Sequence, residues 1–127
     1  MPFVRVSYLD NQYTEAELPI ISQCILETLM THFHVPADDY FQIFHGHSKH
    51  EFYYDPQYLG VARSDRLLYI HISLASGRST EQKRQFYRAL ASLISTKCQI
   101  CDNDIFVVLH ETEREDWSFG KGLAQMI

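Results

Sequence analysis

The sequence predicts an α+β domain in which one β-α-β unit is written twice, giving a four-stranded mixed sheet with two helices on one face. Two capping-box motifs, at residues 14–17 and 79–82, lie 65 residues apart. The same offset relates the polar turns that follow the two predicted helices, so that Asp39 matches Asp104. A constant offset over several elements indicates an internal repeat.

The length of 127 residues and the hydrophobic content of 46% fit a single domain with its own core. We expect one domain over residues 1–127. The predicted parts are β-α-β units at about 2–47 and 67–110, a connecting segment at 48–66 and a C-terminal segment at 111–127.

The first unit opens with a β-patterned run at 3–8, and a strand is predicted at 40–44. Between them, apolar residues recur at helical spacing: Leu18, Ile21, Ile25, Leu29 and Phe33. Pro19 lies near the start of this helix and has no N–H to donate. Either the helix begins later than the capping box indicates, or its first turn is distorted.

The second unit repeats this order, with strands predicted at 67–74 and 105–109. The offset of 65 gives its helix the positions Lys83, Phe86, Leu90, Ile94 and Cys98. We expect a short hairpin or edge strand in the connecting segment. Right-handed crossovers pair the two strands of each unit in parallel and place both helices on one sheet face.

The helix-free sheet face alternates enough apolar residues to favour burial against other subunits, so we expect a small symmetric oligomer. The formal net charge of −5 and the lack of a basic run argue against a nucleic-acid partner. No apolar stretch approaches the length of a membrane span, and no signal peptide is expected. Three cysteines without paired spacings fit a reducing cytoplasm.

Pro2 follows Met1 at the head of the first strand. Removal of Met1 would leave a secondary amine, and an α-amino group has an ordinary pKa of about 8, suited to proton transfer near neutral pH. The alternative is structural: Pro2 starts a strand at a position where its missing N–H has no consequence.

An N-terminal proline on a β-α-β repeat resembles the tautomerase superfamily, which includes oxalocrotonate tautomerase and the macrophage migration inhibitory factor fold. Similarity to the malonate semialdehyde decarboxylase-like branch runs from Pro2 to about Ala124. It is carried by four segments, residues 35–39, 59–64, 77–83 and 116–120. Each motif alone is weak, and their order together with Pro2 makes the resemblance specific.

The resemblance implies roles for individual residues. Pro2 would be the catalytic amine, and Asp39 would assist the reaction and help to keep the proline protonated. Arg78 would bind the substrate carboxylate, while Trp117 and Phe119 would form walls of the pocket. The resemblance also implies a homotrimer whose sites lie near subunit contacts.

The sequence departs from the decarboxylase pattern at Ser76, where that enzyme has a second arginine. We count Ser76 among the substrate-binding positions. One guanidinium can still hold a carboxylate through two parallel hydrogen bonds. Arg63 and Arg66 are the candidates to replace the missing group, and the loss favours tautomerisation over decarboxylation.

Two opposing effects decide the chemistry of the amine. Burial disfavours the ammonium form, whereas the Asp39 carboxylate favours it. A neutral amine is a general base for keto–enol tautomerisation. A cationic amine would assist loss of CO₂ or addition of water.

The sequence thus predicts a tautomerase-superfamily enzyme acting on a small enol or keto carboxylic acid, with no cofactor and no metal. Two alternatives stay open: a decarboxylase or hydratase of a 3-oxo acid such as malonate semialdehyde, and a non-catalytic oligomeric binding protein of the same fold. Retention of Met1 would favour the binding protein, because an amide nitrogen has no basicity.

Each candidate residue also has a structural alternative. Asp39 is expected in a turn, where Asp104 is its counterpart, and both would then cap backbone N–H groups. Arg78 could lie in solvent at a helix start, although the helix dipole disfavours a cation there. Trp117 and Phe119 could pack an oligomer interface.

Two further patterns suggest metal or redox chemistry. The histidines His45, His47 and His50 are close in sequence, with His110 as a possible partner, but zinc needs converging ligands, and we interpret them as exposed polar residues. Cys98 and Cys101 have CxxC spacing. Because the repeat places Cys98 at the core position of Phe33, we expect no redox role.

Overall fold

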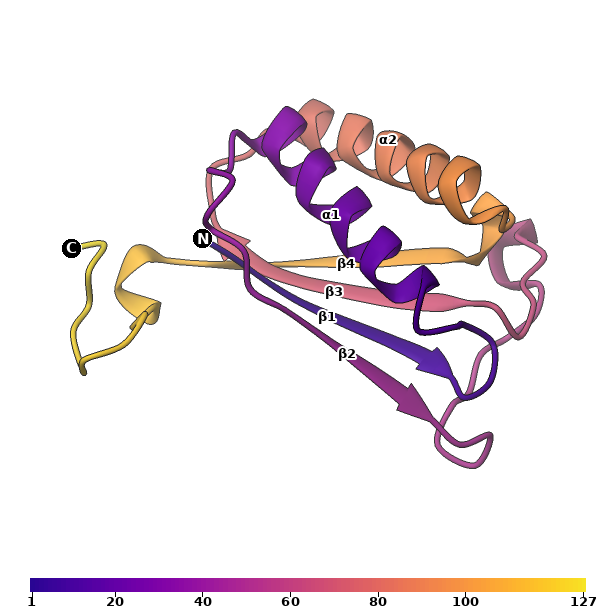
Figure 1. Ribbon diagram of the computed structural model, residues 1–127. Coiled ribbons are helices and arrows are strands. Elements are labelled where there is room, and N and C mark those ends of the chain that lie inside the picture. Colours follow the sequence, from indigo (N-terminus) through magenta and orange to yellow (C-terminus); the bar gives the residue numbers. More distant parts are fainter.

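The computed structural model describes all 127 residues and forms one four-stranded sheet covered by two helices (Figure 1). The sheet order is β2-β1-β3-β4, with β1 antiparallel to β3 and the other two pairs parallel. The elements are β1 (Pro2–Leu9), α1 (Glu17–Phe33), β2 (Gln42–His47), β3 (Leu68–Ala75), α2 (Thr80–Cys98) and β4 (Ile105–Thr112). This arrangement confirms the predicted α+β class with a tandem β-α-β repeat.

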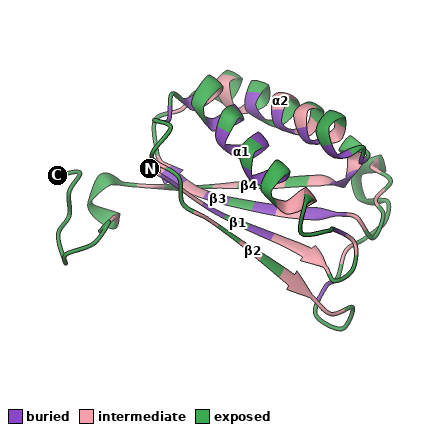
Figure 2. Ribbon diagram, viewed as in Figure 1, coloured by how far each residue is buried: buried purple, intermediate pink, exposed green.

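The core lies between the helices and the sheet, where Figure 2 shows the buried residues. The predicted apolar stripes of both helices point into this core, with Leu18 packing against its edge. The exception is Lys83, which pairs with Glu111 instead. Phe33 at the end of α1 stacks on Phe86 of α2, with ring centroids 4.5 Å apart. Burying such rings joins the two copies of the repeat through one continuous core.

The start of α1 explains how the helix accommodates Pro19. The Glu17 carboxylate accepts from the Thr14 N–H at 3.0 Å, and the Thr14 hydroxyl accepts from the Glu17 N–H at 3.2 Å. The helix begins at Glu17, later than the motif indicates, so Pro19 lies in the first turn. An N–H in the first turn has no partner within the helix, and proline is tolerated there.

The ends of the two helices also repeat at the offset of 65. His34 and Gln99 both adopt the left-handed conformation, with φ of 57° and 56°. Val35 and Ile100 follow them and are buried to the same extent, each 5% exposed. The repeat is therefore one of backbone geometry as well as of sequence.

The connecting segment differs from the expectation, because it forms no strand. It contains one 3₁₀ turn, Tyr58–Gly60, and is held by side-chain hydrogen bonds instead of a strand ladder. The Tyr54 hydroxyl donates to Asp65 at 2.7 Å, and one nitrogen of Arg63 donates to several backbone carbonyls. These local bonds satisfy polar groups that a hairpin would have paired.

The helix-free face of the sheet is open in the single chain. Ile43 is 48% exposed, Val108 45% and Phe106 39%. Apolar side chains gathered on one open face are typical of a surface that associates with another protein surface. Neither helix is long and apolar enough to cross a membrane.

Candidate active site

A cavity of about 690 Å³ lies at the end of the sheet where β1 begins and where β3 and β4 end. The N-terminus, the end of α1, the β3–α2 loop and the segment after β4 line it, together with the last two residues of the chain. Because β3 and β4 are parallel neighbours, the loops that follow them meet at the same edge. The repeat thus brings segments far apart in sequence to one place.

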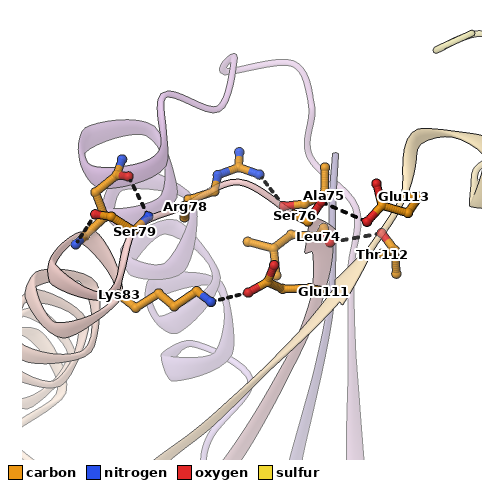
Figure 3. Close-up of polar contacts among 10 residues, drawn as sticks. Leu74, Ala75, Ser76, Arg78, Ser79, Lys83, Glu111, Thr112 and Glu113 are labelled. Atoms are coloured by element: carbon orange, nitrogen blue, oxygen red, sulfur yellow. Dashed lines mark hydrogen bonds and ion pairs between the residues drawn. The ribbon is translucent and has the colours of Figure 1, made fainter.

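The β3–α2 loop is shaped by Gly77 and Ser79. Gly77 has a backbone φ of 119°, a value that residues other than glycine adopt only with strain. Ser79 caps α2: its hydroxyl accepts from the Gln82 N–H at 3.1 Å, and its own N–H donates to the Gln82 side chain at 2.9 Å. These two residues fix the backbone on both sides of Arg78, and Figure 3 shows Ser79 with its capping bonds next to Arg78.

The guanidinium of Arg78 is half-buried and has no carboxylate partner. It donates to the Ala75 carbonyl at 2.8 Å and to the Phe33 carbonyl at 3.2 Å. It also lies 5.4 Å from the centroid of the Phe33 ring. Burial lowers the pKa of Arg78, while Glu111 and Asp39 act in the opposite direction. Arginine stays cationic in proteins, so this is a positive charge without a paired anion.

Two other polar groups next to Arg78, Lys83 and Ser76, already have carboxylate partners, as Figure 3 shows. Lys83 forms an ion pair with Glu111, and that contact lowers the pKa of Glu111. The Ser76 hydroxyl donates to the Glu113 carboxylate at 3.0 Å. Ser76 therefore lines the cavity with its hydroxyl engaged, and Arg78 remains the buried cation available to an anionic ligand.

The N-terminus enters the cavity from the opposite side. The amino group of Met1 forms an ion pair with Oδ2 of Asp39, and Met1 lines the cavity. The other oxygen of Asp39, Oδ1, is buried without a hydrogen-bond partner. Pro2 is buried and pairs with Leu74 across the β1–β3 ladder. While Met1 is present, the Pro2 nitrogen is an amide with no basicity.

Trp117 and Phe119 do not line this cavity within one chain. Their rings are stacked 5.6 Å apart, and the Trp117 indole donates to the Thr112 hydroxyl at 2.6 Å. Phe119 lies against Phe41, which precedes β2, with ring centroids 5.9 Å apart. The aromatic pair is therefore held beside the sheet, on the segment that projects beyond β4 in Figure 1.

Arg63 and Arg66, the expected replacements for a second arginine, are both outside the cavity. Arg66 forms an ion pair with Glu17 at 2.8 Å and lies 4.4 Å from the centroid of the Tyr13 ring. Arg63 is engaged in the connecting segment. The cavity does contain Arg114, which the sequence analysis missed. Its position two residues before the closing aromatic motif was the available signal.

The histidine and cysteine patterns lead to no site. The rings of His45 and His47 are 5.2 Å apart, but no group of three potential ligands in the structure is arranged to hold a metal ion. Cys98 is buried and Cys101 is exposed, and neither forms a disulfide. Burial raises the pKa of the Cys98 thiol, which makes it a poor nucleophile.

Comparison with known proteins gives the class. The family described as "Tautomerase enzyme" matches residues 39–120. "Probable tautomerase YusQ" of Bacillus subtilis (strain 168) is 44% identical over 127 residues, covering 100% of this chain and 99% of that protein. "Probable tautomerase YrdN" of the same organism is 30% identical, covering 100% of this chain and 97% of that protein.

A solved structure of malonate semialdehyde decarboxylase has a TM-score of 0.90 and 28% identity, covering 98% of this chain and 95% of that one. A fused 4-OT symmetric trimer shares the fold, with a TM-score of 0.78, 18% identity and coverage of 98% and 96%. The chain belongs to this family of tautomerase enzymes, and its structure places it beside the decarboxylase-like branch.

Proposed function

We propose that this chain, once Met1 is removed, uses the Pro2 amine for acid–base chemistry on a small enol or keto carboxylic acid. The observation that carries the proposal is the position of the N-terminus. The terminal residue Met1 and the unpaired Arg78 cation line one cavity, and the Asp39 carboxylate, which has one unpaired oxygen, pairs with the terminal amine from outside the lining. These are the groups that proton transfer on a carboxylic acid requires.

Removal of Met1 changes the cavity in two ways. It vacates the volume that Met1 occupies beside Arg78, and it leaves Asp39 without its partner. The new terminus lies one residue further along β1, about 3.8 Å away by the spacing of successive Cα atoms. The Pro2 amine can then take the place of the Met1 amine opposite Asp39.

In this proposal Arg78 binds the substrate carboxylate and orients the reacting carbon toward Pro2. The amine takes a proton from one atom of the substrate and returns it to another, which interconverts the enol and keto forms. Asp39 sets how much of the amine is protonated, because a neighbouring carboxylate favours the ammonium form. Both groups are supplied by the chain itself, so the proposed mechanism uses no cofactor.

A second candidate is decarboxylation or hydration of a 3-oxo acid. Two observations favour it: the ion pair between the terminal amine and Asp39, which stabilises a cationic amine, and the similarity to malonate semialdehyde decarboxylase. A cationic amine at this point would stabilise the negative charge that develops as CO₂ leaves.

Ser76, Trp117 and Phe119 belong to the proposal in lesser roles. Ser76 would contact the substrate only after its hydroxyl leaves Glu113. We assign a wall role to the aromatic pair only within a homotrimer, because the pair lies outside the cavity of its own chain. The exposed helix-free face and the trimer of the same fold support that assembly. A cytoplasmic location is part of the proposal and agrees with three free cysteines.

The test begins with the intact mass of the purified protein, which shows whether Met1 is absent. Processed protein is then assayed with enol forms of 2-oxo acids, followed by ultraviolet absorbance, and with 3-oxo acids, followed by release of CO₂. General acid–base catalysis contributes roughly 100-fold or more, so Pro2→Ala should lower turnover by about that factor. A variant extended by one residue before Pro2 should be inactive.

Turnover by the extended variant would refute the role of Pro2. Processed protein that binds these acids and converts none of them would instead support the non-catalytic binding protein. Release of CO₂ without enol turnover would establish the second candidate.

A further inference from the structure

The cavity is lined by two arginines that come from different loops. Arg78 belongs to the β3–α2 loop, and Arg114 begins the 3₁₀ turn Arg114–Asp116 after β4. The two loops are joined where they leave the sheet, because the Ser76 N–H donates to the Thr112 carbonyl at 2.9 Å. The Ser76 hydroxyl adds the bond to Glu113, next to Arg114. The separation of the two arginine backbones is therefore fixed by the sheet.

Arg114 has no partner in the structure: it forms no hydrogen bond, and no carboxylate oxygen lies within 4.0 Å of its guanidinium nitrogens. The other cations nearby are neutralised, Met1 by Asp39 and Lys83 by Glu111. The acidic groups of the cavity are on Glu113, which accepts from Ser76, on Glu115 and on the last residue, Ile127, and none of them lies within 4.0 Å of a guanidinium nitrogen of either arginine. Two unpaired guanidinium groups thus border one cavity, one half-buried and one at its exposed rim.

Neither guanidinium has a carboxylate within ion-pair distance, so a ligand that carries two anionic groups can pair with both. Guanidinium groups suit carboxylates, because their fixed N–H donors match the two oxygens. The cavity volume of about 690 Å³ lies in the ordinary range of small-molecule sites and exceeds the needs of a three-carbon acid.

We infer that the site selects small dicarboxylates, with Arg78 holding the carboxylate beside Pro2 and Arg114 holding the distal carboxylate. This inference rests on the proposed function for the role of Arg78 and deepens it by naming the substrate class. It assigns specificity to a residue on the rim and does not depend on which reaction follows.

The test compares two acids of equal length by titration calorimetry on processed protein. The probes are 2-oxoglutarate, a five-carbon dianion, and 2-oxopentanoate, which lacks only the distal carboxylate. One charge-assisted contact at a partly exposed site corresponds to roughly a fivefold to tenfold difference in dissociation constant. Wild-type protein should therefore bind 2-oxoglutarate tighter by about that factor. Arg114→Gln should remove the difference and leave the affinity for 2-oxopentanoate unchanged.

Arg88→Gln provides the matched control, because Arg88 is an exposed arginine of α2 without a partner and its loss changes the net charge equally. Equal weakening of 2-oxoglutarate binding by Arg88→Gln and Arg114→Gln would refute the inference, because the affinity would then depend only on the overall charge of the protein. So would equal affinity of wild-type protein for the two acids, or failure to bind either one. Arg78→Gln should weaken both acids alike. Binding that follows this pattern in a protein without turnover would uphold the inference while refuting the proposed function.

Discussion

The two ends of the repeat have the same backbone geometry but different side chains at equivalent positions. One end, which we call the open end, has the cavity lined by Met1 and Arg78, with Pro2 next to Met1 in the chain and Asp39 paired to the Met1 amine. Residues at the offset of 65 form its counterpart, the closed end: Leu67 for Pro2, Asp104 for Asp39 and Tyr13 for Arg78. Met1 likewise corresponds to Arg66.

Side chains fill most of the closed end, where a cavity of only about 120 Å³ remains beside Leu67. Leu67 is fully buried, and the guanidinium of Arg66 lies over the ring of Tyr13 and pairs with Glu17. Burial of Tyr13 raises the pKa of its hydroxyl to about 12. The charges of Arg66 and Glu17 are paired with each other, so this pair contributes to stability and neither charge is free for a ligand.

The two aspartates show the difference most clearly. Asp104 is 3% exposed, and its oxygens accept from the N–H of Ser64 at 2.7 Å and from its hydroxyl at 2.6 Å. It ties the connecting segment to the repeat. Asp39 has one oxygen paired to the terminal amine and the other without a partner. Equal positions in a repeat therefore do not imply equal roles, and hydrogen-bond satisfaction distinguishes a structural residue from one available for chemistry.

The largest expected effect is a difference in kcat/KM between variants of Arg78 at the open end and Arg66 at the closed end. Arg78→Gln removes the buried cation of the open end, and loss of a charge-assisted bond of 2–3 kcal/mol should lower kcat/KM by about 100-fold. Arg66→Gln at the closed end should leave kcat/KM within about twofold and cost about 1 kcal/mol of the free energy of unfolding. Steady-state kinetics and urea unfolding of both variants measure these changes. Comparable loss of turnover in the two variants would contradict the division into open and closed ends.

An intermediate effect is expected from the paired aspartates. Asp104→Asn places an amide N–H₂ donor opposite the Ser64 N–H and hydroxyl, which now donate to the carboxylate. This change should lower the free energy of unfolding, measured in urea, by about 2 kcal/mol. Asp39→Asn should cost less, about 1 kcal/mol, because it loses only the ion pair between one oxygen and the terminal amine, and the other oxygen has no partner to lose. Turnover should respond in the opposite order, with Asp39→Asn lowering it and Asp104→Asn changing it little. A larger unfolding cost for Asp39→Asn would make Asp39 a structural turn residue.

The smallest effect concerns acid stability at the closed end. The Thr14 N–H, followed by Arg66, lowers the pKa of Glu17 below its ordinary value of 4.5. Folding therefore favours the ionised carboxylate, whose contribution is present above the unfolded-state pKa and is lost as the pH falls through the lower folded-state pKa. Glu17→Gln keeps a group that can accept from Thr14 and removes the charge.

Thermal unfolding between about pH 5 and pH 3 should show a slightly smaller loss of stability for Glu17→Gln than for wild-type protein. Glu15→Gln is the matched control, because Glu15 is exposed and forms no hydrogen bond. An identical pH profile for Glu17→Gln and wild-type protein would show that Arg66 and Glu17 contribute nothing measurable to the closed end.

Local patterns predicted most of the fold because they report local physics. Helical spacing placed the buried faces of both helices, and the capping motifs predicted bonds that the structure shows at Thr14 and Ser79. The connecting segment was mispredicted as a hairpin or edge strand because its order comes from side chains such as Tyr54 and Arg63 bonding to partners that no periodic pattern marks.

The candidate site divides in the same way. The repeat and the family resemblance selected Pro2, Asp39 and Arg78, and the structure brings these three to one end of the sheet. Arg114 was missed because its one signal, a position two residues before the closing aromatic motif, does not separate it from the exposed charges around it. Arg114 lines the cavity only because the parallel strands β3 and β4 end together.

The sequence by itself determined the class, the repeat and the elements, since periodicity, caps and turns depend on neighbours within a few residues. Only the tertiary structure decided which end of the repeat is open, which aspartate has an unpaired oxygen and which arginines share the cavity. Burial and hydrogen-bond satisfaction depend on groups brought together from distant positions, and these quantities determine where charge is free to bind a ligand.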